Sequence, residues 1–176
     1  MTPIQYQSPD IWNTIWSRPY VNYEKHHTLF WFMIRKSVQG RILDLGCGSA
    51  SYWKGFDGQL VGIDFSSAAI AEAKKNYPLG LFFCQAIPTD MFEGLWFDIV
   101  VLSGVVNYYR DLTPIISMLQ GIGGKGTTII ITINVLQDFP DRNWTAEYID
   151  DIFFSLGIVS RIFVEKVGWF ITIERL

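Results

Sequence analysis

Two aspartates stand where a carboxylate could bind a ligand. Asp44 ends a short hydrophobic run and precedes a turn that contains Gly46, Cys47 and Gly48. Glycine lets a backbone approach a ligand closely and leaves amide groups at the start of the next helix free to donate, so this turn could bind a ligand. Asp64 ends the next hydrophobic run, and its two oxygens could accept hydrogen bonds from two ribose hydroxyls. The pair indicates a nucleoside site, although a plain strand-to-helix turn and a solvated carboxylate remain the alternatives.

Two neighbouring strands are needed to place these two acids at one edge of a sheet, and the chain shows the alternation of strands and helices that such a sheet requires. From position 41 onward, short β-branched runs alternate with helix-like runs, which is typical of a parallel sheet with crossover helices. The expected strands are Arg41 to Leu45, Leu60 to Ile63, Leu81 to Cys84, Asp98 to Leu102 and Thr127 to Ile133.

The segments between and after these strands agree with that fold. Two runs at the C-terminal end, Arg161 to Val167 and Trp169 to Arg175, lie too close together for a helical crossover, so we expect an antiparallel hairpin. Capping and glycine signals predict helices between the strands. These are a helix capped by Ser66 or Ser67 that ends near Asn76, a helix over Asp111 to Leu119, and a helix from Thr145 to Gly157.

The stretch from Ile42 to Ser51 resembles the first motif of class I S-adenosylmethionine-dependent methyltransferases, and Leu60 to Ser66 resembles their second motif. The resemblance covers about residues 41–176. It implies an α/β fold, a Rossmann-like methyltransferase sandwich with a mostly parallel seven-stranded sheet, a C-terminal antiparallel hairpin and helices on both faces. It also implies S-adenosylmethionine as cofactor and S-adenosylhomocysteine as product. Ala50 departs from the pattern, because the family often has a third glycine there.

The resemblance also implies the residues that hold the cofactor. In that family the first acid and the glycines cradle the amino-acid end, the second acid binds the ribose, and the following residue packs on the adenine. Where an acid usually faces the adenine amino group, this chain has Gln85, so Gln85 or Asp90 would replace it. The expected cofactor-binding residues are Asp44, Gly46, Cys47, Gly48, Asp64, Phe65, Gln85, Ala86, Ile87, Ser103 and Tyr20.

The loop after the fourth strand should face the methyl group, which makes Asn107 and Tyr108 candidates for catalysis. The only histidines, His26 and His27, are natural general bases near neutral pH, but adjacent residues cannot face the same way on a helix. We therefore take His26 as the third catalytic candidate, with a structural role for both histidines as the alternative. A hydroxyl acceptor needs a base, whereas a neutral amine or a thiolate does not. No cluster of acids suggests a catalytic metal.

We expect one domain, with residues 1–38 as a helical aromatic lid and residues 39–176 as the cofactor-binding core. The aromatic residues of the first segment could equally be core. A small-molecule acceptor is expected. A protein or peptide acceptor is the alternative, because the pocket could be covered by this segment, left open for a large substrate or completed by another subunit. The aromatic cluster is Trp12, Trp16, Tyr20, Tyr23, Phe30, Trp31 and Phe32.

Composition excludes several other classes. The chain has 176 residues, of which 49% are hydrophobic, so it can bury a core without disulfides or metals. Its two cysteines have no paired spacing, which fits a reducing compartment. The net charge of -3 comes without a basic patch, so double-stranded nucleic acid is an unfavourable partner. No segment has the length of a membrane span, and we expect a cytoplasmic protein, monomer or homodimer.

Two rival functions come from other classes. A nicotinamide-dependent dehydrogenase would share the glycine turn, but Ser51 replaces the third glycine of that fingerprint. A noncatalytic module that binds S-adenosylmethionine without turnover would explain Ala50 and the missing acid at Gln85.

Overall fold

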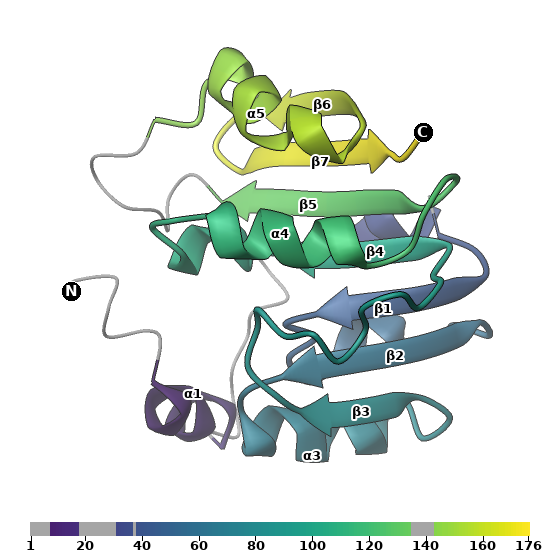
Figure 1. Cartoon of the computed structure of the whole chain (residues 1–176). Coiled ribbons are helices and arrows are strands. Elements are labelled where there is room, and N and C mark those ends of the chain that lie inside the picture. Colours follow the sequence, from purple (N-terminus) through teal and green to yellow (C-terminus); the bar gives the residue numbers. More distant parts are fainter. Residues whose placement is uncertain (1–7, 18–30, 37, 135–142) are drawn as a thin grey trace.

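The computed structural model describes residues 8–17, 31–36, 38–134 and 143–176. The predictions for Tyr20, His26 and His27 fall outside these residues. The described chain forms one sheet in the order β3-β2-β1-β4-β5-β7-β6 (Figure 1). The strands are β1 (Arg41–Leu45), β2 (Gln59–Asp64), β3 (Leu81–Cys84), β4 (Ile99–Ser103), β5 (Thr128–Asn134), β6 (Ile158–Val164) and β7 (Gly168–Glu174).

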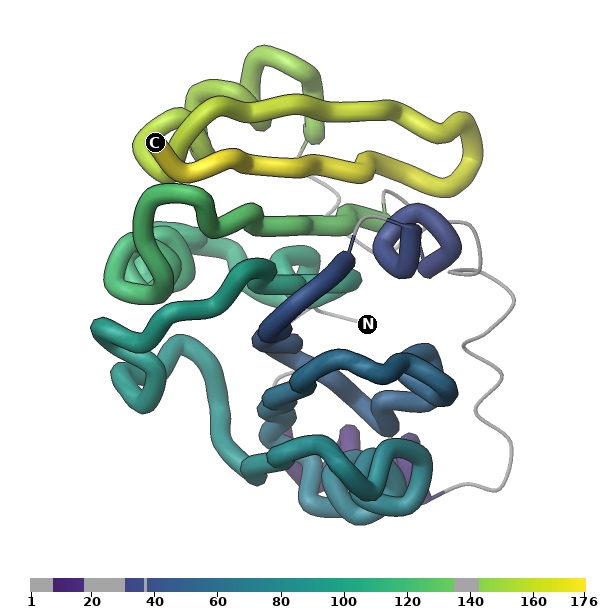
Figure 2. The backbone as a smooth tube through the Cα atoms, turned by 90° about the vertical axis from the view of Figure 1, so that its right-hand side faces the viewer, coloured from purple at the N-terminus to yellow at the C-terminus, as the bar shows by residue number. Residues whose placement is uncertain are grey.

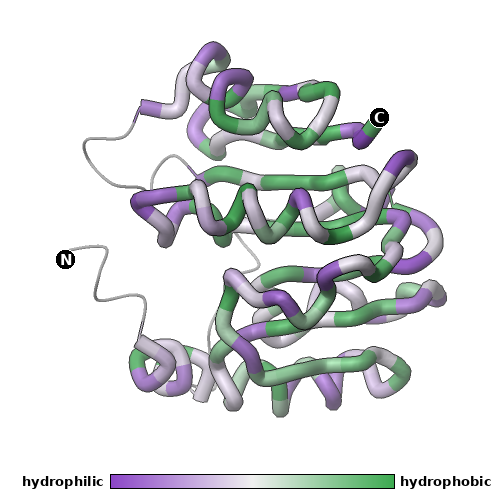
Figure 3. Tube along the Cα trace, viewed as in Figure 1, coloured by the Kyte–Doolittle hydropathy of each residue, from purple (hydrophilic) through white to green (hydrophobic). Residues whose placement is uncertain are grey.

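Strands β1 to β5 pair in parallel, while β7 pairs antiparallel with both β5 and β6. The predicted hairpin is therefore present, although β6 begins at Ile158 rather than at Arg161, and Gly168 is the first residue of β7. The seven-stranded, mostly parallel sheet confirms the predicted fold class. The hydrophobic strands stand out in Figure 3 as green segments between hydrophilic turns.

Two hydrophobic cores cover the two faces of this sheet. On one face, residues 31–36, the short 3-10 helix η2 (Ser51–Trp53) and α3 (Ser67–Asn76) cover the sheet. On the other face, α4 (Thr113–Gly121), α5 (Ala146–Phe153) and the following 3-10 helix η4 (Phe154–Leu156) pack against β4, β5 and β7. Figure 2 shows residues 31–36 and α4 on opposite sides. Among the described residues, no helix is long and apolar enough to cross a membrane.

Local signals fix the ends of the helices. The Ser66 hydroxyl accepts from the Ala69 amide at 3.2 Å, and α3 ends at Asn76, just before the Tyr77-Pro78 pair. The Thr145 hydroxyl accepts in the same way from the Tyr148 amide at 3.1 Å. These bonds satisfy amides that have no partner within their own helices, as the capping signals predicted.

The first crossover is shorter than the strand-to-helix pattern suggests. The turn after β1 leads into η2, a three-residue 3-10 helix, and Ala50 directly before it has a left-handed conformation with φ of 51°. Arg35 donates to the carbonyls of Tyr52 and Lys54 and so satisfies the end of η2. The turn and η2 lie at the carboxyl edge of the sheet, where a cavity opens.

The N-terminal helix α1 (Pro9–Trp16) lies at that open edge, beside α3 (Figure 1). The side-chain oxygen of Asn13 accepts from the Ser66 hydroxyl at 2.8 Å and from the Ala68 amide at 3.3 Å. A polar side chain of α1 thus joins the first turn of α3, and α1 is positioned against the residues that directly follow β2.

Candidate functional site

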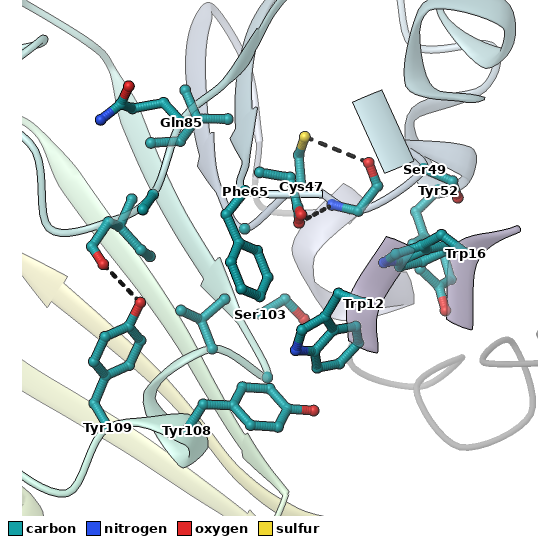
Figure 4. Close-up of a pocket in the computed structure, with 18 of the residues that line it drawn as sticks. Trp12, Trp16, Cys47, Ser49, Tyr52, Phe65, Gln85, Ser103, Tyr108 and Tyr109 are labelled. Atoms are coloured by element: carbon teal, nitrogen blue, oxygen red, sulfur yellow. Dashed lines mark hydrogen bonds between the residues drawn. The ribbon is translucent and has the colours of Figure 1, made fainter. Parts of the chain in front are cut away.

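A cavity of about 270 Å³ opens at the carboxyl edge of the sheet, where β1, β2 and β4 end (Figure 4). Strands β1 and β4 are neighbours although two strands separate them in the chain, and ligands of open α/β sheets bind at such a switch point. Its walls come from α1, the helix at residues 31–36 and the turns after β1 to β4. The lining residues are Trp12, Trp16, Trp31, Gly46, Cys47, Gly48, Ser49, Tyr52, Ile63, Asp64, Phe65, Gln85, Ala86, Ile87, Ser103, Gly104, Val105, Tyr108 and Tyr109.

The glycine turn is tied to the neighbouring strand by its backbone. The amides of Gly46 and Cys47 both donate to the Ile63 carbonyl, at 2.8 and 2.9 Å. Gly46 has a φ of 81°, and a Cβ there would lie 2.5 Å from a methyl carbon of Val105. Only glycine satisfies both the left-handed backbone and this close approach, so the sequence signal reflects a real steric requirement.

Asp64 presents a fixed carboxylate to the cavity. One oxygen accepts from the Gly48 amide at 3.0 Å and the other from the Ser66 amide at 2.8 Å. Burial raises the pKa of Asp64, while these two amides lower it. Because each amide comes from a different turn, the carboxylate also holds the glycine turn against the start of α3.

Asp44 lies outside the cavity lining, buried beneath the glycine turn with 1% of its surface exposed. The indole N–H of Trp53 donates to its carboxylate at 2.6 Å. Burial raises the pKa of Asp44 to about 7, the Trp53 bond opposes the shift, and the charge of Asp64 adds to it. Its predicted contact with the cofactor stays a prediction.

The turn after β3 places Gln85, Ala86 and Ile87 in the cavity lining. In Figure 4 the Gln85 side chain points away from Phe65. The Tyr109 hydroxyl donates to the Ile87 carbonyl at 2.8 Å, and burial raises the pKa of Tyr109 to about 12. This bond joins the turns after β3 and β4, a contact that the sequence did not indicate.

Of the residues predicted after β4, Ser103 and Tyr108 line the cavity and Asn107 does not. The Asn107 side chain is buried and bonds both ways with the backbone of Asn134, accepting from its amide at 3.1 Å and donating to its carbonyl at 3.0 Å. This pair of hydrogen bonds joins the 3-10 helix η3 (Val106–Tyr108) to the end of β5. Asn107 is thus placed behind the cavity, next to a residue that faces it.

Helix α1 supplies the aromatic part of the cavity wall. Trp12 is 7% exposed, and its ring centroid lies 5.3 Å from that of Tyr108, edge-on, and 6.2 Å from that of Phe65. Trp16 also lines the cavity and lies against Gly48. Among the described residues, Trp12, Trp16 and Trp31 of the predicted aromatic cluster therefore reach the site.

Sequence reasoning missed other residues of the cavity. Tyr52 follows the glycine turn and stacks on Trp31 at a centroid distance of 4.1 Å, and its aromatic character directly after the turn was the available signal. Gly104 and Val105 also line the cavity, and they belong to the loop after β4 that was expected to face the methyl group. Asn13 carried no signal, because its partners lie 53 or more residues away in the chain.

Comparisons with known proteins agree with this arrangement. Residues 36–152 match the model of a family described as a methyltransferase domain. No curated protein sequence matches the chain. The match spans the glycine turn, Asp64 and the loop after β4, so it covers every strand that contributes to the cavity.

Solved structures similar to the chain include the PH0226 protein from Pyrococcus horikoshii OT3, with 13% identity over all of both chains and a TM-score of 0.72. The N-methyltransferase NodS from Bradyrhizobium japonicum WM9, in complex with S-adenosyl-L-homocysteine, is 14% identical over 94% of this chain and 96% of NodS, with a TM-score of 0.70. Magnesium protoporphyrin IX methyltransferase from Synechocystis PCC 6803, with bound SAM, is 16% identical over 95% and 90% of the two chains, with a TM-score of 0.64. At these identities the likeness is one of fold.

Proposed function

This chain belongs to the class I S-adenosylmethionine-dependent methyltransferase family, and we propose that its cavity holds S-adenosylmethionine beside a small-molecule acceptor, whose nitrogen or oxygen receives the methyl group. The observation that carries the proposal is the carboxylate of Asp64 in the cavity wall, with each oxygen bound to one backbone amide. A carboxylate has about four acceptor positions, so both oxygens keep capacity for ribose hydroxyls. The residue therefore fits a ribose.

The remaining walls suit the other parts of the cofactor. Phe65 and Ile87 line the same cavity and offer apolar surface to an adenine ring. The turn at Gly46 and Gly48 exposes backbone at a close approach and would hold the amino-acid end. Asp44 lies beneath that turn with its pKa raised to about 7 in the free chain. A ligand ammonium group nearby would favour the ionised form of Asp44 and be stabilised by its charge.

S-adenosylmethionine supplies a methyl group on a sulfonium, which leaves as S-adenosylhomocysteine. The protein then needs to align the acceptor with that group and to exclude water, because displacement in line depends mainly on orientation. Trp12 and Tyr108 form an aromatic wall that could do both. Asn107, bonded to the end of β5, would position Tyr108.

A small acceptor agrees with a cavity that α1 partly covers. It also agrees with similar folds whose names state such substrates, including an amino pentose methyltransferase from Micromonospora echinaspora. The predicted role of His26 as a base belongs to the same proposal and concerns only hydroxyl acceptors. An amine acceptor would react through its own lone pair.

Calorimetric titration with S-adenosylmethionine, S-adenosylhomocysteine and NAD tests the proposal. We expect the first two to bind and NAD not to bind. The substitution Asp64→Ala should weaken binding of both more than tenfold, since hydrogen bonds to a charged group contribute about 1.5 to 3 kcal/mol. Asp57→Ala, which removes an exposed carboxylate before β2, is the matched control and should leave the affinity unchanged.

Two outcomes would contradict the proposal. Binding of NAD alone, or unchanged affinity in Asp64→Ala, would remove the ribose assignment. Binding of S-adenosylmethionine without formation of S-adenosylhomocysteine across an acceptor screen would leave a binding module in place of an enzyme.

A further inference from the structure

Trp12 and Tyr108 form an aromatic corner in the cavity, and this name is used below for these two residues. Their rings meet edge to face, with an interplanar angle of 84°. Figure 4 shows Trp12 between Ser103 and Trp16, with Tyr108 beneath it. Because the two rings come from α1 and η3, the corner exists only when these elements are docked at the carboxyl edge.

Each ring of the corner has an asparagine next to it in the sequence, and the hydrogen bonds of that asparagine fix the element that carries the ring. Asn13 follows Trp12 and accepts hydrogen bonds from Ser66 and Ala68 at the start of α3. Asn107 precedes Tyr108 and bonds twice to Asn134. A surface whose side chains are held in place loses little conformational entropy when a ligand binds, so the corner is preorganised.

The electrostatic character of the surroundings restricts what the corner can accept. Among the lining residues that the structure describes, Asp64 carries the only formal charge, and it is negative. Ring faces of tryptophan and tyrosine attract cations, and a flat apolar group packs well against them. A carboxylate or phosphate on the acceptor would lose its hydration and find no opposite charge among these lining residues.

From these observations, and resting on the proposed function, we propose that the aromatic corner is the acceptor subsite and that it takes a flat, apolar amine rather than an anionic acceptor. The ring of the acceptor would pack on Trp12 and Tyr108. Its amine would react as the neutral base after losing its proton to solvent. The nitrogen lone pair forms the new N–C bond while the C–S bond of the sulfonium breaks and S-adenosylhomocysteine leaves. Asn13 acts as a positioning residue for Trp12.

Two probes with the same ring test the charge preference: 2-phenylethylamine and phenylacetate. Their binding to the full chain saturated with S-adenosylhomocysteine is measured by ligand-observed NMR titration. We expect the amine to bind at least about tenfold more tightly than the carboxylate, because the carboxylate loses its hydration without gaining a cationic partner among the described lining residues.

Variants test the place of binding. Trp12→Leu should weaken binding of 2-phenylethylamine about fivefold or more, whereas affinity for S-adenosylhomocysteine changes less than about threefold. Trp96→Leu, which removes a 44% exposed tryptophan outside the cavity, is the matched control and should change neither affinity. Asn13→Ala should weaken amine binding like Trp12→Leu. Asn13→Asp should restore it, because its oxygens can still accept from Ser66 and Ala68.

Each result separates this proposal from the one on which it rests. Failure of wild type to bind S-adenosylhomocysteine would refute the proposed function. With that binding intact, the acceptor subsite is refuted by equal or tighter binding of phenylacetate, by no binding of either probe, or by full amine binding in both Trp12→Leu and Asn13→Ala. A parallel loss of S-adenosylhomocysteine affinity in Trp12→Leu would assign Trp12 to the cofactor instead.

Discussion

Asp44→Asn should make the free protein less sensitive to alkaline pH. Burial raises the pKa of Asp44 from its ordinary value of 3.8 to about 7. Between these values the native protein keeps a proton on Asp44 that the unfolded chain has lost. The native state then binds more protons, so the free energy of unfolding falls as pH rises and levels off above about 7. The asparagine amide does not titrate and can still accept from the Trp53 indole N–H.

The size of the effect follows from the two pKa values. Between about pH 5 and about pH 8, ionisation of Asp44 should cost the wild type about 2 to 3 kcal/mol of stability that the variant does not lose. Burial also raises the pKa of Asp64, but this contribution is present in both proteins and largely cancels in the comparison. Urea unfolding of both proteins at both pH values, without ligand, gives the required difference.

Equal pH dependence in the two proteins would refute a buried, neutral Asp44 in the free chain. So would a wild type that becomes more stable than the variant as pH rises. If Asp44 contributes to cofactor binding, Asp44→Asn should also weaken binding of S-adenosylmethionine, while it stabilises the free protein at alkaline pH. Such opposite effects are expected where a functional group reduces stability.

Three further substitutions test other parts of the structure. Trp53→Phe removes the indole N–H that lowers the pKa of Asp44, so the loss of stability with rising pH should continue to a higher pH in this variant than in the wild type; urea unfolding across pH measures it. Gly48→Ala should reduce the free energy of unfolding by at least about 1 kcal/mol, because φ is 51° and the new Cβ would lie 2.7 Å from the Trp16 ring; adding Trp16→Leu should recover part of that loss. Thr145→Ala should cost about 1 kcal/mol by removing the cap of α5, and unchanged thermal stability would contradict the capping bond.

Several features of the fold could be predicted because they depend on neighbours in the sequence. The β-branched runs gave β1 and β3 with their observed ends, and Ser66 and Thr145 cap helices through amides three residues away. The short connection before Gly168 forced the hairpin. Periodicity, caps and turn lengths act over a few residues, so a single sequence displays them directly.

Part of the candidate site was also visible in this way. The glycine turn and Asp64 follow consecutive strands, and parallel pairing of β1 with β2 brings them to one edge. Once the sheet forms, the Gly48 amide lies within hydrogen-bond distance of the Asp64 carboxylate, and this contact needs no side chain from a distant part of the chain. The position of these residues was therefore a consequence of the strand pattern.

By itself the sequence determined the succession of strands and helices along the chain, the helix caps, the hairpin and the glycine turn with its acid. Only the tertiary structure decided that Trp53 bonds Asp44, that Asn107 lies behind the cavity against Asn134, and that Asn13 joins α1 to α3. Each of these contacts joins segments whose separation in sequence carries no periodic signal. Their partners are selected by packing over the whole sheet, where a buried polar group must find a hydrogen bond and the folded chain offers few candidates.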